Sequence, residues 1–413
     1  MLRILLPALL IAGLIGTVVR FGREGEEAAA NPVAASVSVP APSTATATVA
    51  VKDTVRASIA EVMTRQGAAL LAGDRKAFVG VAAPSAKDSV AWLDDRFTTL
   101  RAMGVTRWTV TVGEVRSSAK YWEAGVDVEY CFVANCVKPL KAGLSTHWNV
   151  GYGTRTEITE IWDRVVGRTI HPWAQSKLTA VAGRRVVVAA PAALAARMPR
   201  VLATAEAAAK VADGFAATDR PGRYVLYLAG EKEWDAWAYG DEGSWVDGYA
   251  NADSEAVVVR ASALSSADLG MLLRHEFAHV ASLVGRSVAV SNADAWWLKE
   301  GLADYAGFGP RSFGSFPRRT ETAAFVRKGW NGDLRVQAPG QKASDRTASA
   351  RYGVAYLGVQ CLIQRYGQSR ATSFVQAVAV QGVTIEIAAA RSLGATWKTV
   401  NSTCATQIRK TVG

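Results

Sequence analysis

The stretch His275-Glu276-Phe277-Ala278-His279 decides how the rest of the chain is interpreted. Residues four apart lie on one face of an α-helix, so the two imidazoles can point at a single metal ion. Glu276 lies beside that face, where its carboxylate can hold and deprotonate a metal-bound water. The stretch therefore predicts a catalytic metal site on a helix. The competing interpretation is a buried histidine pair that is satisfied within the core, because short motifs also occur by chance.

A second motif follows downstream, Trp297-Leu298-Lys299-Glu300-Gly301-Leu302-Ala303-Asp304-Tyr305, and twenty residues separate His279 from Glu300. Two imidazoles and one carboxylate leave a fourth position open on Zn²⁺, which is typical of catalytic zinc sites. We expect Glu300 to be the third ligand of one zinc ion per chain. Asp304, one turn further along, can accept the second ring N–H of a ligating histidine and fix its tautomer.

Together the two motifs, His-Glu-x-x-His and Trp-x-x-Glu-Gly-x-Ala-x-Tyr, resemble those of the gluzincin zinc metallopeptidases (peptidase MA-like), especially the branch related to aminopeptidase N and thermolysin. The pattern covers roughly residues 180–413, but only the two motifs are specific. The resemblance implies peptide-bond hydrolysis with Zn²⁺ bound by His275, His279 and Glu300, and with Glu276 as the general base.

The resemblance also implies a tyrosine that opens a later helix and donates its hydroxyl to the tetrahedral oxyanion. Tyr352 matches this place in a helix that we expect over residues 351–366, and Tyr356, one turn later, is the substitute donor. A ring that merely packs in the core is the alternative for either tyrosine.

One feature departs from the family. The Gly-x-Met-Glu-Asn segment with which aminopeptidases of this branch grip a free α-amine is absent, and the chain has Gly248-Tyr249-Ala250-Asn251 before the metal helix. An endopeptidase acting on a peptide or protein substrate is therefore favoured over an aminopeptidase. The resemblance further implies that the strand at 256–260 is a sheet edge that pairs with an extended substrate. An ordinary buried strand fits the sequence equally well.

Two other functions compete with a peptidase. The first is a catalytically inactive, membrane-tethered binding or sensor protein on a zincin scaffold, although the intact Glu276 counts against it. The second is a zinc hydrolase of a non-peptide amide, such as a cell-wall component. The net charge of +11 favours an anionic neighbourhood such as lipid head groups or wall polymers, but a general solvated basic surface is the preferred explanation. There is no dense Lys/Arg run with interleaved aromatics, so no nucleic-acid partner is expected.

The N-terminus is interpreted as an export segment. Residues 4–19 form an uncharged run between Arg3 and Arg20, so residues 1–23 are a signal peptide or a membrane anchor. Uncleaved, the segment places the chain in the cell membrane with its bulk extracytoplasmic; cleaved, the protein is secreted. Residues 24–50, rich in Ala, Val, Ser, Thr and Pro, are expected to be a disordered linker.

At 413 residues the chain is long enough for two or three domains, and its overall class is expected to be α+β. Residues 51–166 read as helices followed by antiparallel strands at 108–115, 121–132, 148–152 and 156–162. This order resembles the cone fold of the nuclear transport factor (NTF2-like) superfamily, which implies either a ligand pocket or a mere spacer or cover for the protease cleft.

Residues 175–413 are expected to form the metallopeptidase domain. It has strands at 185–189, 224–228 and 256–260 and a mainly helical C-terminal part, with a helix at 191–215 that Pro199 bends or divides. The metal helix is expected to start after Ser265 or Ser266 and to end at Gly285. The helix with Glu300 spans 294–308, where Gly301 and Ala303 allow close approach to the metal helix. The polar region 309–349 shows little periodicity.

The four cysteines fall into two pairs. An even number of cysteines in an exported chain predicts two disulfides, Cys131 with Cys136 across a turn and Cys361 with Cys404 between helices. Four buried thiols in a reducing compartment are the alternative.

Overall fold

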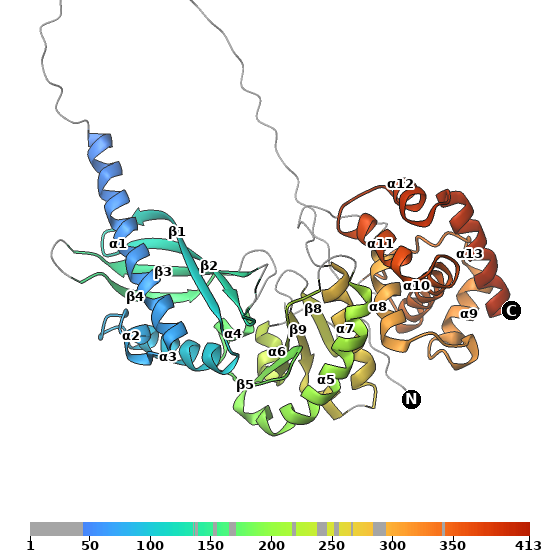
Figure 1. The fold of residues 1–413 in the computed structure, drawn as a ribbon, viewed down its shortest axis with the longest axis horizontal. Helices are drawn as coiled ribbons and strands as arrows, with labels where there is room; N and C mark the ends of the chain where they lie inside the picture. The colour runs from blue at the N-terminus through green and yellow to red at the C-terminus, as the bar shows by residue number, and fades with distance from the viewer. Residues whose placement is uncertain are drawn as a thin grey trace, which may run out of the picture.

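The computed structural model describes residues 44–134, 136, 139–151, 155–164, 171–216, 220–237, 246–251, 256–265, 267–283, 295–340 and 343–413. The predicted export segment 1–23 and residues 24–43 of the predicted linker lie outside these ranges. None of the helices in the described ranges is long and apolar enough to cross a membrane. Figure 1 shows a first part of helices and a sheet, a middle part with a second sheet, and a helical C-terminal part in succession. The predicted α+β class is confirmed.

The first part places three helices before an antiparallel sheet, in the predicted order. The helices are α1 (Thr44–Ala72), α2 (Arg75–Val79) and α3 (Lys87–Ala102). The sheet has the order β1-β2-β3-β4, and its strands are β1 (Arg107–Ser117), β2 (Trp122–Cys131), β3 (Leu140–Asn149) and β4 (Glu157–Asp163). Apolar side chains at helical spacing in α1, such as Ile59, Met63 and Leu70, are buried against the sheet. Whether this part is an NTF2-like cone stays a prediction.

Two boundaries in the first part differ from the sequence-based expectation. Helix α1 begins at Thr44, inside the range predicted as a linker, where three alanines among residues 44–50 favour the helix. Strand β3 begins at Leu140 rather than at residue 148. The small residue Gly143 is itself buried, which hides the apolar alternation on which the prediction depended.

The middle part contains a five-stranded sheet in the order β5-β6-β7-β9-β8. Strands β6, β7 and β9 run parallel, and the two outer strands pair antiparallel with their neighbours. The bounds are β5 (Thr179–Ala182), β6 (Val186–Ala190), β7 (Tyr224–Ala229), β8 (Gly248–Asn251) and β9 (Ala256–Arg260). The strand at 256–260 is therefore an inner strand, and the expectation of a sheet edge there is wrong. The two edges of the sheet are β5 and β8.

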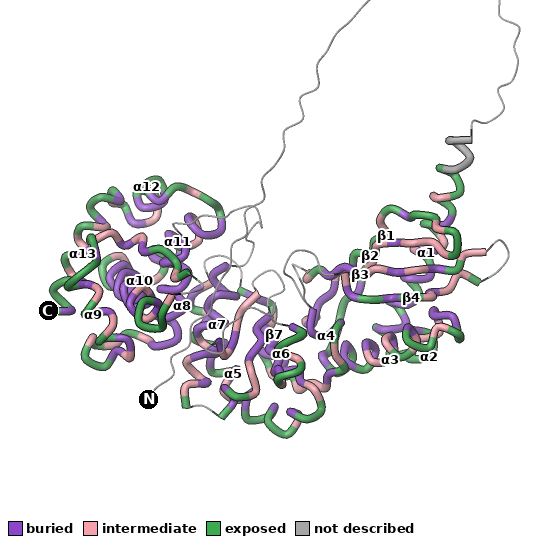
Figure 2. The backbone as a smooth tube through the Cα atoms, turned by 180° about the vertical axis from the view of Figure 1, so that it is seen from behind, coloured by how far each residue is buried: buried purple, intermediate pink, exposed green. Residues whose placement is uncertain are grey.

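Both faces of this sheet are covered. On one face Val186, Leu226 and Val257 pack against α5 (Met198–Ala212) and α7 (Leu269–Leu283). Alternate side chains point the other way and join the apolar core of the first part, together with Trp173, Trp234 and Trp237. These tryptophans lie in or beside α4 (Pro172–Gln175) and α6 (Glu231–Trp237). Figure 2 shows the resulting concentration of buried residues around β7 and α7. The core is thus continuous across the predicted boundary between 51–166 and 175–413.

Proline divides the helix that was predicted over 191–215. A 3₁₀ turn at Ala192–Arg197 leads into α5, and Pro199 lies in the first turn of that helix. Proline is tolerated there because the first helical N–H groups have no intrahelical acceptor to lose. A further 3₁₀ turn, Asp213–Phe215, follows α5.

The C-terminal part is helical, as predicted. Its helices are α8 (Trp296–Phe308), α9 (Arg319–Lys328), α10 (Asp345–Tyr366), α11 (Gln368–Ala379), α12 (Ile385–Ala388) and α13 (Trp397–Val412). They enclose a separate apolar core. Helix α10 ends before Gly367 as predicted but starts well before residue 351, because Ser344 caps it and its side chain accepts from the Thr347 N–H. Helix α9 was missed because it buries only Thr322 and Val326.

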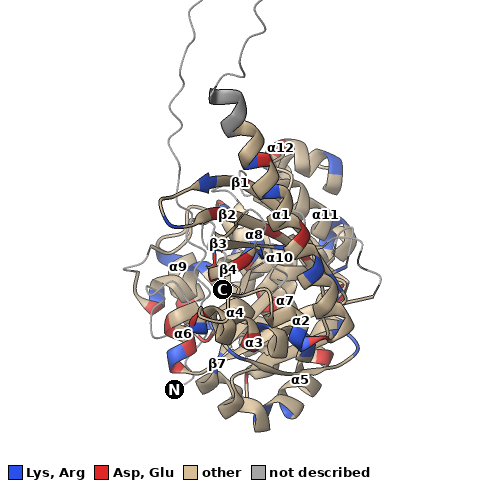
Figure 3. Cartoon of the chain, turned by 90° about the vertical axis from the view of Figure 1, so that its left-hand side faces the viewer, with Lys and Arg blue, Asp and Glu red and all other residues tan. Residues whose placement is uncertain are grey.

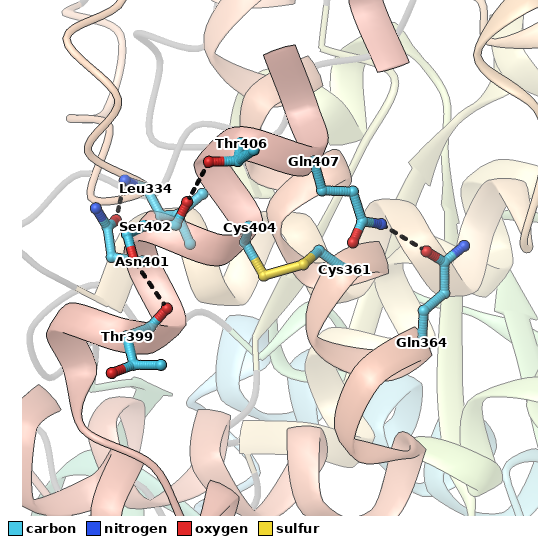
Figure 4. Close-up of a disulfide and its surroundings, with 9 residues drawn as sticks. All are labelled: Leu334, Cys361, Gln364, Thr399, Asn401, Ser402, Cys404, Thr406 and Gln407. Carbon is cyan, nitrogen blue, oxygen red and sulfur yellow. Dashed lines mark hydrogen bonds between the residues drawn. A yellow bond between two sulfur atoms is a disulfide. The ribbon is translucent and has the colours of Figure 1, made fainter. Parts of the chain in front are cut away.

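Both predicted disulfides are formed, Cys131 with Cys136 and Cys361 with Cys404. The second joins α10 to α13, and Figure 4 shows Gln407 donating to Gln364 beside it. This bridge closes a loop with a sequence separation of 43 residues, against 5 for the first, and so restricts the unfolded chain more.

Basic and acidic residues are interspersed on the surface. Figure 3 shows both signs along α1 and α6, and α1 carries the ion pairs Arg56–Asp53 and Arg65–Glu61. Exposed pairs of this kind contribute little to stability. That the positive net charge serves an anionic neighbour stays a prediction.

Candidate metal centre

Helix α7 carries the first motif because its two faces contact different layers. Leu272, Leu273 and Phe277 are buried against the second sheet, where the Phe277 ring stacks on Tyr224 at 4.6 Å. The opposite face, with His275 and His279, meets α8. The helix starts at Leu269 instead of directly after Ser265, which lies in the 3₁₀ turn Ala261–Ser265. The other proposed cap, Ser266, and the predicted end, Gly285, lie outside the described residues.

Three of the predicted site residues converge between α7 and α8. Nε2 of His275 and Nε2 of His279 lie 3.1 Å apart. Oε2 of Glu300 is 3.6 Å from the first nitrogen and 3.4 Å from the second. All three side chains are buried, with at most 4 % of each side chain exposed. The sequence motifs are therefore assembled into one compact group that could hold a metal ion.

The spacing of these atoms fits a tetrahedral zinc site. Ligand atoms that each lie roughly 2.0–2.2 Å from a central Zn²⁺ are separated from one another by roughly 3.3–3.6 Å. The separations of 3.4 and 3.6 Å that involve Glu300 lie in this range, and the 3.1 Å between the two imidazole nitrogens lies just below it. Two imidazole nitrogens and one carboxylate oxygen are also a donor set that zinc accepts in catalytic sites. The residues present therefore fit a zinc ion.

The charges of the group attract a cation. Burial alone would raise the pKa of Glu300, but the charges of His279 and His275 and their hydrogen bonds lower it to about 2. Burial would lower the pKa of His275, yet its hydrogen bonds with Asp304 and Glu300 raise it to about 10. The carboxylates thus hold positive charge on the His275 imidazole, and a metal ion would replace that charge and release a proton.

Glu276 lies next to His275 in the sequence, but its carboxylate is not part of this group of three. It is fully buried, and neither of its oxygens has a hydrogen-bond partner among the described residues. Burial raises the pKa of Glu276, while the charges of the two histidines oppose the rise. A buried carboxylate without a partner is costly, which indicates a function other than packing.

Asp304 contacts His275 as the sequence predicted. Its Oδ1 lies 3.0 Å from Nδ1 of His275, so it can accept that ring N–H and leave Nε2 free to bind a metal. The other oxygen, Oδ2, accepts a hydrogen bond from Nη1 of Arg318, and this ion pair is almost completely buried. Arg318 is not among the site residues predicted from the sequence, because one arginine in a polar stretch carries no distinguishing pattern.

The two candidate tyrosines have different surroundings. Tyr352 is buried and packs edge-on against Trp296, with ring centroids 5.0 Å apart. Burial and the charges of Glu300 and Asp304 raise its pKa well above the usual range, so its hydroxyl keeps its proton. Tyr356 instead donates its hydroxyl hydrogen to the Gly309 carbonyl at 2.9 Å. Because Tyr352 lies close enough to Glu300 and Asp304 for their charges to act on its hydroxyl, it is the better candidate for a donor at the site, although it lies within α10 and not at its start.

Two glycines set the spacing of the helices around Glu300. A Cβ on Gly301 would lie 2.4 Å from the Ala355 carbonyl oxygen, so this glycine permits close contact with α10 and not, as expected, with α7. A Cβ on Gly307 would lie 3.2 Å from the Met271 carbonyl oxygen, so Gly307 is the residue that faces α7.

Substituting Gly301 with alanine is expected to lower the free energy of unfolding by about 1–3 kcal/mol, because the new methyl group meets backbone atoms that cannot move aside. Gly314→Ala is the matched control, since a Cβ there meets nothing within 4 Å. Chemical denaturation of both variants measures the difference. Equal stabilities would contradict the close contact between α8 and α10.

No protein-family model matches the chain, and no curated protein is significantly similar to it. The interpretation of the site therefore depends on its own residues and their geometry.

Proposed function

We propose that the protein is a zinc-dependent peptidase that hydrolyses peptide bonds outside the cytoplasm. The observation that carries this proposal is the buried group of His275, His279 and Glu300, whose ligand atoms are spaced for zinc. Beside it lies the carboxylate of Glu276, which has no hydrogen-bond partner among the described residues. A structural zinc site would use a fourth protein ligand and would have no use for such a carboxylate. The middle and C-terminal parts would then form the zincin-type domain.

Each residue has a defined task in the proposed reaction. His275, His279 and Glu300 would hold the zinc ion, which when bound supplies Lewis-acid activation of a water and of the scissile carbonyl. Glu276 takes a proton from the attacking water and passes it to the leaving amine. Tyr352 donates its hydroxyl hydrogen to the developing oxyanion.

Tyr352→Phe is expected to lower kcat by about 10- to 1,000-fold, because it removes one hydrogen bond that forms only in the transition state. Zinc content and KM should stay within about twofold of the wild type. Steady-state kinetics on a single peptide, together with metal analysis, measure both. Tyr356→Phe is the control, because its hydroxyl is bonded to Gly309. If Tyr356→Phe causes the larger loss in kcat, the roles of the two tyrosines are reversed.

A substrate-profiling digest of residues 44–413 tests the function itself. Purified protein is incubated with a peptide library and, in parallel, with cell-wall fragments. Cleavage of internal peptide bonds that stops with a chelator and returns with zinc supports an endopeptidase. Release of single N-terminal residues would identify an aminopeptidase, and cleavage of wall fragments alone would identify the non-peptide amide hydrolase. Zinc binding without any cleavage would favour the inactive binding protein.

The location of the protein belongs to the same proposal. Two disulfides fit an oxidising compartment, which supports export through the predicted N-terminal segment. The bulk of the chain would then lie outside the cytoplasmic membrane, tethered to it or secreted.

A further inference from the structure

We propose that Arg318 is a positioning residue of the metal centre, which holds Asp304 in the place where that carboxylate orients His275. This inference rests on the proposed zinc function and extends it to a residue in a third helix. Nδ1 of His275 lies 3.0 Å from Oδ1 of Asp304, and Oδ2 of the same carboxylate accepts from Nη1 of Arg318. The chain of contacts thus joins α7, α8 and the start of α9.

The ion pair of Asp304 and Arg318 is buried, so Arg318 strongly influences the position of the Asp304 carboxylate. The side chains of Asp304 and Arg318 are each 1 % exposed. Removing one partner of such a pair leaves an uncompensated charge, so each constrains the other strongly. A guanidinium is planar and fixes the orientation of a carboxylate better than an ammonium group does. Arg318 therefore determines where the oxygen that faces His275 can lie.

The guanidinium is itself held by two aromatic rings. Its central carbon lies 4.9 Å from the centroid of the Tyr352 ring and 5.4 Å from that of Phe308. Cations over aromatic faces are attracted by the ring electrons, more strongly where water is excluded. Arg318 thus contacts two residues of the proposed catalytic group, Asp304 and Tyr352, at the same time.

The backbone of Arg318 is equally fixed. Its carbonyl oxygen accepts from the N–H of Thr322 at 3.0 Å and from the Thr322 hydroxyl at 2.7 Å. Thr322 is fully buried, and a Cβ on Gly353 would lie 1.8 Å from its hydroxyl oxygen. Gly353 is the residue after Tyr352, so the start of α9 is held against α10 directly beside the candidate donor.

The test measures zinc affinity, which does not depend on turnover. Arg318→Met is expected to raise the zinc dissociation constant by about 10- to 100-fold. Substitutions of residues that hold the metal ligands in place typically weaken metal binding by this amount. Arg318→Lys, which keeps the charge but not the planar fork, should give a smaller rise. Competition with a coloured chelator measures the zinc dissociation constants of the wild type and of the two variants. The absorption spectrum of the Co²⁺-loaded protein should change in the variants, since it reports ligand orientation.

A control and a double variant separate this role from general packing. Arg311 also lies over the Phe308 ring, at 5.4 Å, but it donates to the Phe308 carbonyl instead of to Asp304. Arg311→Met should leave zinc affinity and the Co²⁺ spectrum unchanged. Asp304→Asn with Arg318→Met should bind zinc no more weakly than Asp304→Asn alone, because Arg318 acts through Asp304. The double variant also removes the unpaired charge that could prevent Arg318→Met from folding.

The outcomes are distinguishable from failure of the proposed function. Suppose that the wild-type protein binds one zinc ion, and that Arg318→Lys and a folded Arg318→Met protein bind it equally tightly. The role of Arg318 is then overturned while the peptidase proposal stands. Fully additive losses in the double variant would also overturn it. If the wild-type protein binds no zinc, both proposals are overturned together.

Discussion

Glu276→Gln is expected to reduce kcat for peptide hydrolysis by at least about 100- to 10,000-fold while one zinc ion stays bound. Glutamine keeps the size of the side chain but cannot take a proton from water. Because Glu276 is not one of the three ligands and its carboxylate has no hydrogen-bond partner among the described residues, its replacement leaves the ligand group intact. Peptide kinetics and metal analysis by mass spectrometry measure the two effects separately.

Glu206→Gln is the matched control for this substitution. Oε1 of Glu206 accepts hydrogen bonds from the backbone N–H groups of Arg185 and Val186, at 2.8 and 2.9 Å. A glutamine oxygen can accept the same bonds, so this variant should retain wild-type kinetics. Hydrolysis by Glu276→Gln within about fivefold of the wild type would remove Glu276 from the proposed mechanism.

His279→Ala is expected to raise the zinc dissociation constant by at least about 100-fold, and hydrolysis should fall with the metal content. The variant removes one of three ligands, and it leaves Glu300 without the imidazole that lies 3.4 Å from its Oε2. Excess zinc should restore part of the activity, which a variant that had lost its fold could not show. Equilibrium dialysis against zinc buffers gives the dissociation constant.

His147→Ala serves as the control, because this histidine stacks on Tyr121 at 4.0 Å and pairs with Glu160 in the first part of the chain. It should bind zinc as tightly as the wild type. Unchanged zinc affinity in His279→Ala would show that the metal, if any, is held elsewhere.

Much of the candidate site could be predicted because its geometry is local. His275 and His279 lie one turn apart, so helical periodicity alone brings their rings together. Asp304 and Glu300 are likewise one turn apart on α8, and both face α7 in the structure. Only the meeting of the two helices was not implied by spacing, and that step depended on the resemblance of the motifs to a known family.

The parts that could not be predicted depend on tertiary contacts. Arg318 looks like any other arginine until α9 places it against Asp304. Strand β8 is four residues long and contains glycine, so it has too little alternation to be recognised. It pairs with β9 and so covers the sheet edge that the resemblance implied at 256–260. Gly301 signalled a close approach correctly, but the sequence alone does not say which neighbouring helix fills the space.

The most direct test of the zinc site is a crystal structure of residues 44–413 grown with zinc, with anomalous scattering recorded at the zinc edge. We predict one strong peak per chain, about 2.0–2.2 Å from Nε2 of His275, Nε2 of His279 and a carboxylate oxygen of Glu300. A map with no peak between these side chains, or with zinc held only by other residues, would contradict the proposed enzyme.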